Sequence, residues 1–384
     1  MKNLYLHDDC IISPLGFTTS KNLEKLRSGT TGLQEYDNNE FLEVPICAGV
    51  VNSSVLADAF LQIGDPKEYT KLEQMLLLAV HKILMENPDL NIKETGLVIS
   101  TTKGNVHLLD NLGDFKKERL LLSNLGEIIK DFFGFTLKPI VVSNACISGG
   151  LALAVAKKMI SAGKFNQAIV VGGDMLSKFI VSGFNSFQAL SEIACKPFSK
   201  DRTGINLGEA AAAVLVSDRP IENVININLV GDASANDANH ISGPSRTGEG
   251  LYKSIQNSLK EAGISSTAIK AISTHGTATL YNDEMEAIAI ARSGLGEVFL
   301  NSVKGYYGHT LGASALIEAI LCKHMMLNSE IYPSLNFNKL GVSKKINVVN
   351  AYQDSVHLEY VLKTASGFGG CNLALVFKKE GEND

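Results

Sequence analysis

The feature that most constrains the fold is the stretch 140–154, where a short apolar run ends at a cysteine and small residues follow. The run Ile140-Val141-Val142 is typical of a buried strand, and the Ser, Gly, Ala and Leu residues after Cys146 are typical of a helix that neighbours approach closely. A thiol at such a junction faces the positive end of the helix dipole, which can lower a cysteine pKa below about 8.5. The stretch therefore predicts a strand, a candidate nucleophile and a buried helix, although a lone cysteine here is more often an inert core residue.

Composition excludes several classes of protein. The 384 residues carry a net charge of -5 that is spread along the chain, so we expect no nucleic-acid partner. No apolar run approaches about 18 residues and acids occupy the N-terminus, which predicts a cytoplasmic protein without a membrane segment. The 6 cysteines show no Cys-x-x-Cys spacing, so we expect free thiols and no metal site.

The order of the predicted elements indicates two related α/β halves. The strand, reactive residue and small-residue helix around Cys146 are echoed by an apolar run at 298–301 and a second small-residue helix at 311–316. We place the boundary at residues 222 and 223, giving halves 1–222 and 223–384. The segment 179–206 has little periodicity, and so long an irregular segment usually covers a site. The other predicted strands are 4–12, 96–100, 167–171, 209–216, 224–230, 269–273, 361–366 and 373–377, and the clearest predicted helices are 21–27, 68–84 and 283–292.

Two histidines of the second half follow predicted strands. His275 lies in Ser273-Thr274-His275-Gly276-Thr277, and His309 ends the run that begins at Lys304. Ligands collect outside the carboxyl ends of strands in open α/β sheets, so these side chains and Cys146 are expected to share one site. One cysteine and two neutral imidazoles suit acyl transfer through a thioester, followed by stabilisation of an enolate.

At this point the motifs carry a family resemblance over nearly the whole chain. The order of the motifs along the chain resembles that of the β-ketoacyl-acyl carrier protein synthases. Within the thiolase-like superfamily, the resemblance is to the elongating branch, which has two histidines. The motifs are Ser13-Pro14-Leu15-Gly16, Asn144-Ala145-Cys146, Lys196-Pro197-Phe198-Ser199-Lys200-Asp201-Arg202-Thr203-Gly204, Leu207-Gly208-Glu209, Asp237-Ala238-Asn239-His240, His275-Gly276-Thr277, Lys304-Gly305-Tyr306-Tyr307-Gly308-His309 and Gly367-Phe368-Gly369-Gly370.

The resemblance implies a thiolase-like fold with buried mixed sheets layered between helices (αβαβα), and it implies a reaction. Cys146 would take an acyl chain from acyl carrier protein, and His275 and His309 would assist decarboxylation of malonyl-carrier protein and hold the enolate. The resulting carbanion would attack the acyl-Cys146 carbonyl and give a β-ketoacyl chain two carbons longer. Lys304 would support His309 and pair with Glu318, since a buried ammonium needs a partner.

The resemblance also implies secondary roles. The backbone N–H groups of Cys146 and Phe368 would form the oxyanion hole, and Phe368 would gate the pocket. The remaining positions are substrate-binding Thr277, Thr279, Phe368 and Gly369, and supporting Asp283 and Glu286, with Glu209 and His240 as further framework positions. Because the substrates travel on the phosphopantetheine of acyl carrier protein, we expect that partner and no cofactor. Relatives are dimers, so we expect a homodimer, or a heterodimer with a related ketosynthase-like subunit.

Departures from the family pattern leave alternatives open. Thr102-Lys103-Gly104 replaces a more glycine-rich loop, Asn282 replaces a usual Gly, and Cys371 stands where Thr or His is common. One alternative is a chain-length-controlling partner subunit, which the presence of Cys146 disfavours. Another is a thiolase or starter-unit synthase acting on acyl-coenzyme A, which the run from Lys304 to His309 disfavours. The sequence leaves the pathway open between fatty acid and polyene or polyketide synthesis.

Overall fold

Strand β1 (Tyr5–Ile12) lies where the two halves of the largest sheet meet. The computed structural model describes residues 3–36, 41, 45–238 and 243–381. Within these ranges β1 belongs to an 11-stranded sheet. Its strands are, in spatial order, β12 (Asn347–Val348), β11 (Phe299–Asn301), β10 (Ile269–Ser273), β13 (Tyr360–Gly367), β14 (Cys371–Glu380), β9 (Asn226–Asn236), β1, β8 (Ala210–Ser217), β6 (Gln167–Asp174), β4 (Gly96–Ser100) and β5 (Ile140–Val142).

The two halves of this sheet repeat one topology. In the first, β8 pairs antiparallel with both β1 and β6, and β4 pairs parallel with β6 and β5. In the second, β14 pairs antiparallel with both β9 and β13, and β10 pairs parallel with β13 and β11. The internal repeat that the sequence predicts is therefore present as a repeated order of strands. The predicted boundary at 222/223 lies in the connection between β8 and β9, and it stays a prediction.

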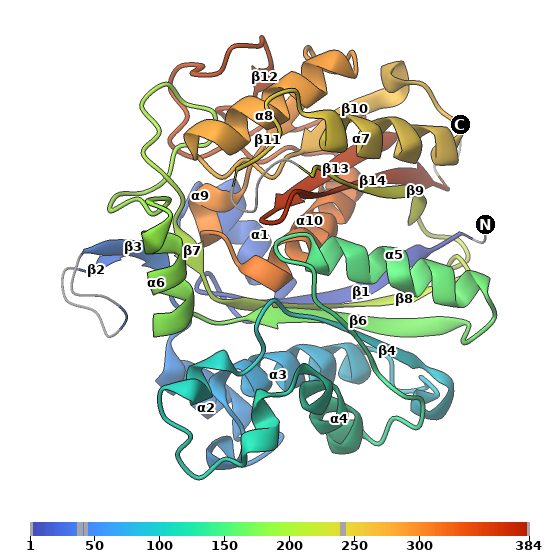
Figure 1. Ribbon diagram of the computed structural model, residues 1–384. Coiled ribbons are helices and arrows are strands. Elements are labelled where there is room, and N and C mark those ends of the chain that lie inside the picture. The colour runs from blue at the N-terminus through green and yellow to red at the C-terminus, as the bar shows by residue number, and fades with distance from the viewer. Residues whose placement is uncertain (1–2, 37–40, 42–44, 239–242, 382–384) are drawn as a thin grey trace.

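Helices form three layers around the two halves of the sheet (Figure 1). One outer layer contains α2 (Ser53–Phe60), α3 (Lys71–Glu86) and α4 (Leu122–Phe133), and the opposite one contains α7 (Glu249–Ala262) and α8 (Leu280–Arg292). The central layer is α5 (Ser148–Ser161) and α10 (Ser314–Asn328). This αβαβα arrangement confirms the predicted fold class. The smaller elements are α1 (Thr19–Arg27), α6 (Lys178–Ser186), α9 (Lys304–Tyr307) and a three-stranded sheet of β2 (Gln34–Tyr36), β3 (Ile46–Gly49) and β7 (Leu207–Gly208).

The two central helices pack closely because α5 begins with glycines. A Cβ added to Gly149 would lie 2.7 Å from the backbone N of Leu316 in α10, and one added to Gly150 would lie 2.5 Å from Leu373 Cδ2. Both positions therefore exclude a side chain, although glycine is a poor helix former. This contact brings the start of α5 against the second half of the chain.

Two sequence-based boundaries are wrong. Strand β6 continues through Gly172 and Gly173 to Asp174, because the small glycines fit against Ser100 and Leu76 from neighbouring elements. The segment predicted as irregular contains α6, whose start is capped by Ser177, since its Oγ accepts from Ile180 N at 3.3 Å.

Among the described residues, every helix falls short of the length and apolarity that crossing a membrane requires.

Candidate active site

Cys146 lies in a tight turn between β5 and α5. The preceding residue, Ala145, adopts a left-handed conformation with φ of 45°, which is costly for a residue with a Cβ. Ser148 stabilises this turn, because its Oγ accepts from Asn144 N at 2.8 Å and donates to Ala145 O at 2.6 Å. The turn presents the thiol at the start of α5, as the sequence predicts.

The structure brings the two predicted histidines to this thiol. Cys146 Sγ and a ring nitrogen of each of His275 and His309 lie within 4.8 Å of one another. The two imidazole centroids are 5.1 Å apart with an angle of 85° between the ring planes. All three residues are buried. Three reactive groups from distant parts of the chain thus converge on one point.

Two carboxylates of α8 fix the loop that carries His275. Glu286 accepts from the backbone N–H groups of His275 and Gly276, both at 2.8 Å, and Asp283 accepts from Thr277 N at 3.0 Å. Both acids are fully buried, and burial raises the pKa of Asp283 to about 7 and raises that of Glu286. Their contacts support the predicted framework role.

Backbone contacts determine the orientation of His309. Its N–H donates to Asn206 O at 2.7 Å, and its Nδ1 accepts from Leu311 N at 3.3 Å. With Nδ1 as an acceptor, a neutral ring carries its proton on Nε2. This Nε2 is buried and has no hydrogen-bond partner among the described residues, so it is available to donate to a substrate oxygen.

Next to the histidines lies a buried group of three charges, which we call the lysine–glutamate cluster: Lys304, Glu318 and Lys363. Lys304 Nζ pairs with Glu318 Oε1, as the sequence predicts. Lys363 Nζ lies 2.8 Å from the other oxygen, Oε2. Sequence reasoning missed Lys363, although a lysine within the apolar strand at 361–366 is itself a signal.

Burial and this cluster determine the charge of the site. The pKa values of His275 and His309 lie well below the ordinary value, first because of burial and then because of the two nearby lysines. The imidazoles are therefore neutral at neutral pH. Burial raises the pKa of the Cys146 thiol to about 12, so the expectation of a pKa lowered by the helix dipole is wrong. Removing a thiolate from water raises the pKa of the thiol more than Lys304 and the Phe368 N–H lower it.

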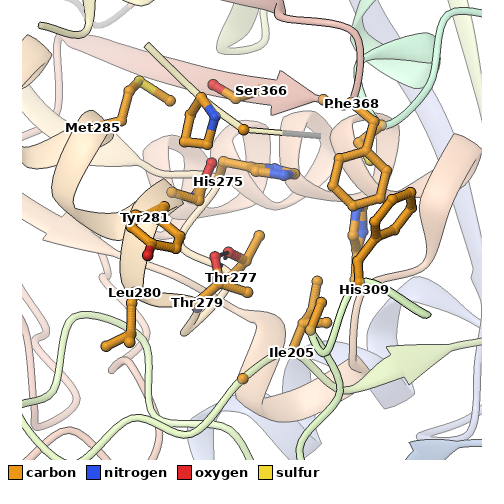
Figure 2. Close-up of a pocket in the computed structure, with 18 of the residues that line it drawn as sticks. Ile205, His275, Thr277, Thr279, Leu280, Tyr281, Met285, His309, Ser366 and Phe368 are labelled. Atoms are coloured by element: carbon orange, nitrogen blue, oxygen red, sulfur yellow. Dashed lines mark hydrogen bonds between the residues drawn. The ribbon is translucent and has the colours of Figure 1, made fainter. Parts of the chain in front are cut away.

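The three groups open onto a cavity of about 560 Å³. Thr277 and Thr279 lie on its wall near His275, with their hydroxyls 2.9 Å apart, and Phe368 lies across the cavity from Tyr281 (Figure 2). The cavity is thus lined by the predicted substrate-binding positions, including Gly369.

Phe368 occupies the β13–β14 turn beside the nucleophile. Its backbone N–H lies close enough to the Cys146 sulfur to lower the pKa of the thiol, and its ring packs on Phe184 and Phe187, each with centroids 5.2 Å away. The contact with the sulfur supports the predicted oxyanion role. Sequence reasoning missed Phe184 of α6 and Phe187 just after this helix, and only their spacing of three residues within the segment 179–206 could have indicated them.

Other singled-out residues lie around this site. Cys371 Sγ is 3.8 Å from Asn144 O and 3.6 Å from Phe368 O, so this departure from the family pattern contacts both segments that flank Cys146. Glu209 has a framework role, because it accepts from Val51 N at 2.9 Å and Leu176 N at 3.1 Å. His240 lies outside the described residues.

Comparisons with known proteins agree on one family. The family model described as the N-terminal domain of β-ketoacyl synthase matches residues 11–220, and the corresponding C-terminal domain matches residues 228–338. A putative mitochondrial 3-oxoacyl-[acyl-carrier-protein] synthase of Schizosaccharomyces pombe is 27% identical over 99% of both chains. A 3-oxoacyl-[acyl-carrier-protein] synthase 2 of Rhizobium meliloti is 30% identical over 62% of this chain and 60% of that protein. A ketosynthase in complex with its chain length factor from Xenorhabdus doucetiae superposes with a TM-score of 0.88 at 24% identity, covering 99% of this chain and 98% of that one.

Proposed function

The chain belongs to the β-ketoacyl synthase family, a family of condensing acyltransferases, and from that premise we propose that it is catalytically competent and extends carrier-bound acyl chains by two carbons. The observation that carries the proposal is the convergence of one thiol and two neutral imidazoles within 4.8 Å on the wall of a cavity of about 560 Å³. A chain-length-controlling subunit has no need of this arrangement.

The first step transfers the acyl group to Cys146. The sulfur attacks the thioester carbonyl of the acyl-carrier protein, the C–S bond to the carrier breaks, and the carrier leaves as a thiol. Because the Cys146 thiol holds its proton at neutral pH, a neutral imidazole accepts that proton as the new bond forms and passes it to the departing carrier sulfur. His275 suits this role, because its Nδ1 has no hydrogen-bond partner among the described residues. The backbone N–H groups of Cys146 and Phe368 stabilise the oxyanion.

The second step depends on His309 and on the lysine–glutamate cluster, both in the second half of the chain. A malonyl-carrier protein loses carbon dioxide, and the electron pair of the broken C–C bond becomes an enolate. His309 Nε2–H donates to the enolate oxygen, supported by His275 and by the lysine–glutamate cluster. The enolate carbon attacks the acyl-Cys146 carbonyl, and the cysteine leaves to give the β-ketoacyl-carrier protein.

The partners and setting of this reaction are part of the proposal. The acyl and malonyl groups arrive on acyl carrier protein, and these residues need no cofactor for the steps above. The names of the curated relatives support the carrier as partner. A dimer is expected, either of two copies or with a related subunit, as in the Xenorhabdus doucetiae complex. A cytoplasmic location remains a prediction, since the Schizosaccharomyces pombe relative is named mitochondrial.

Intact-protein mass spectrometry tests this proposal. Incubation with acyl-carrier protein should add one acyl group, which peptide mapping places on Cys146. The Cys146→Ala variant should fold and lose the adduct, whereas Cys322→Ala, which removes a buried thiol of α10, should keep it. A set of donors from two to sixteen carbons then defines the acyl preference.

Each outcome separates the alternatives. No adduct from any carrier-bound donor would overturn the proposal and favour a non-catalytic partner subunit. Acylation by acyl-coenzyme A but not by acyl-carrier protein would instead favour a thiolase or starter-unit synthase. Acylation of Cys146 followed by no product with malonyl-carrier protein would remove the condensation step from the proposal.

A further inference from the structure

Lys363 places a second positive charge beside the two histidines. It lies in the apolar strand β13, its side chain is 1% exposed, and its Nζ is 2.8 Å from Glu318 Oε2. Lys304 occupies the other oxygen of the same carboxylate. One glutamate thus serves two ammonium groups, which leaves one positive charge of the lysine–glutamate cluster uncompensated within it.

Lys363 also holds the strand from which His275 departs. Its Nζ donates to Ser273 O at 3.2 Å and to Thr364 O, and Ser273 is the last residue of β10. His275 follows two residues later. The ammonium therefore connects β13, the end of β10 and helix α10 at one point.

The charged and titratable groups around Lys363 come from five other parts of the chain. They are Lys304 of α9, Glu318 and Cys322 of α10, Glu286 of α8, and the two histidines themselves. Glu286 is already engaged by the N–H groups of residues 275 and 276 and by Thr364 Oγ1 at 2.7 Å. Glu318 is the group that pairs directly with both lysines.

We propose that Lys363 is a positioning residue of the condensation reaction, which holds Glu318 and the end of β10 in place and adds a positive charge behind His275 and His309. This inference rests on the proposed function of the site. An uncharged His309 has one N–H to give and does not repel its lysine neighbours. A positive charge behind it also stabilises the negative charge that develops on the enolate.

The test is the pH dependence of malonyl decarboxylation in the full-length protein, measured as carbon dioxide release from malonyl-carrier protein. Lys363→Gln keeps polar contacts but removes the charge, so both imidazoles should take up a proton more readily. The acidic limb of the profile should move by about one pH unit to higher pH, which is an approximately tenfold loss of rate at any pH that lies on that limb. Lys363→Arg keeps the charge and should restore the limb of the unmodified protein.

Lys157 provides a matched control. It is 2% exposed and has two acidic partners, Asp232 at 3.0 Å and Glu261 at 2.9 Å, and it is absent from the groups that act on the histidines. Lys157→Gln should lower the melting temperature without moving the profile. If Lys363 has a purely structural role, Lys363→Gln should likewise have a lower melting temperature and an unchanged pH profile.

The outcomes are distinguishable. A folded Lys363→Gln whose profile superposes on that of the unmodified protein overturns the inference, and so does an equal shift in Lys157→Gln. Absence of decarboxylation and of Cys146 acylation in the unmodified protein instead removes the proposed function. If Lys363→Gln does not fold, Lys363→Met, which fills similar space without a charge, is measured in its place, and an unmoved acidic limb in that variant overturns the inference.

Discussion

The two strand-to-helix crossings of the central layer are built alike but carry different chemistry. In the first half, β5 leads through Cys146 directly into α5. In the second half, β11 leads first into the short helix α9 and only then into α10, and this insertion carries Lys304 and ends before His309.

The difference shows how a repeated fold divides a reaction. The direct crossing places Cys146, the proposed nucleophile, at the start of α5. The longer crossing adds a buried ammonium, Lys304, and a buried imidazole, His309. Because α5 and α10 contact each other at Gly149 without an intervening side chain, the two sets of groups meet.

The largest expected effect concerns the nucleophile and its pH dependence. With the pKa of Cys146 raised to about 12 by burial, its thiolate fraction at pH 7 is about a thousandfold below that of an unperturbed thiol. Alkylation by iodoacetamide should therefore be slow and rise about tenfold per pH unit between pH 7 and 10. Mass spectrometry of the Cys146 peptide measures the rate. A plateau below pH 8.5 would mean that the helix dipole outweighs burial after all.

Replacing His309 in the second half should slow malonyl decarboxylation much more than acylation of Cys146. His309→Ala loses Nε2–H at the enolate oxygen, so malonyl decarboxylation should fall by about 100-fold or more, while acylation of Cys146 falls only several-fold. Single-turnover assays of each step measure this split. His81→Ala, on the outer helix α3, is the control and should change neither step. An equal loss of both steps in His309→Ala would contradict the division of labour between the halves.

The contact between α5 and α10 at Gly149 leaves no room for an added methyl group. Gly149→Ala places a Cβ 2.7 Å from the Leu316 backbone, so the free energy of unfolding should fall by about 1–3 kcal/mol. Urea denaturation measures the loss. Gly183→Ala in α6 is the matched control, because no atom lies within 4 Å of its added Cβ and helix propensity then favours alanine by about 0.5–1 kcal/mol. Equal changes in the free energy of unfolding of both variants would show that the close contact between the two halves at Gly149 does not contribute to stability.

The smallest effect is expected at the mouth of the cavity. Phe368→Ala keeps the backbone N–H but loses the ring contacts with Phe184 and Phe187, each worth about 0.5–1.5 kcal/mol. Acylation by long-chain donors should slow by about 3–10-fold, as followed by quench-flow mass spectrometry. Phe179→Ala, 53% exposed on the same helix, should have no effect. If the two variants behave alike, the ring does not gate the cavity.

The sequence by itself determined the repeated fold and which residues meet in the candidate site, because both can be inferred from short stretches of the chain. Three patterns can be recognised from adjacent residues alone. They are a β-branched run before a cysteine, glycines that begin a helix, and histidines just after strands. The motifs at 146, 275, 304–309 and 367–370 appear in an order that few folds share, so the site could be predicted before its geometry was known.

Only the tertiary structure decided how these groups are charged and supported. The helix dipole at Cys146 is a local property, but burial, which raises the pKa of the thiol, comes from elements distant in sequence. Lys363 looks like a misplaced charge in an apolar strand until α10 brings Glu318 to within 2.8 Å. Likewise, Phe184 joins the site only because α6 packs on the β13–β14 turn. Desolvation and charge pairing depend on which surfaces meet in space, and for these groups that is decided by the packing of the two halves and not by the order of residues.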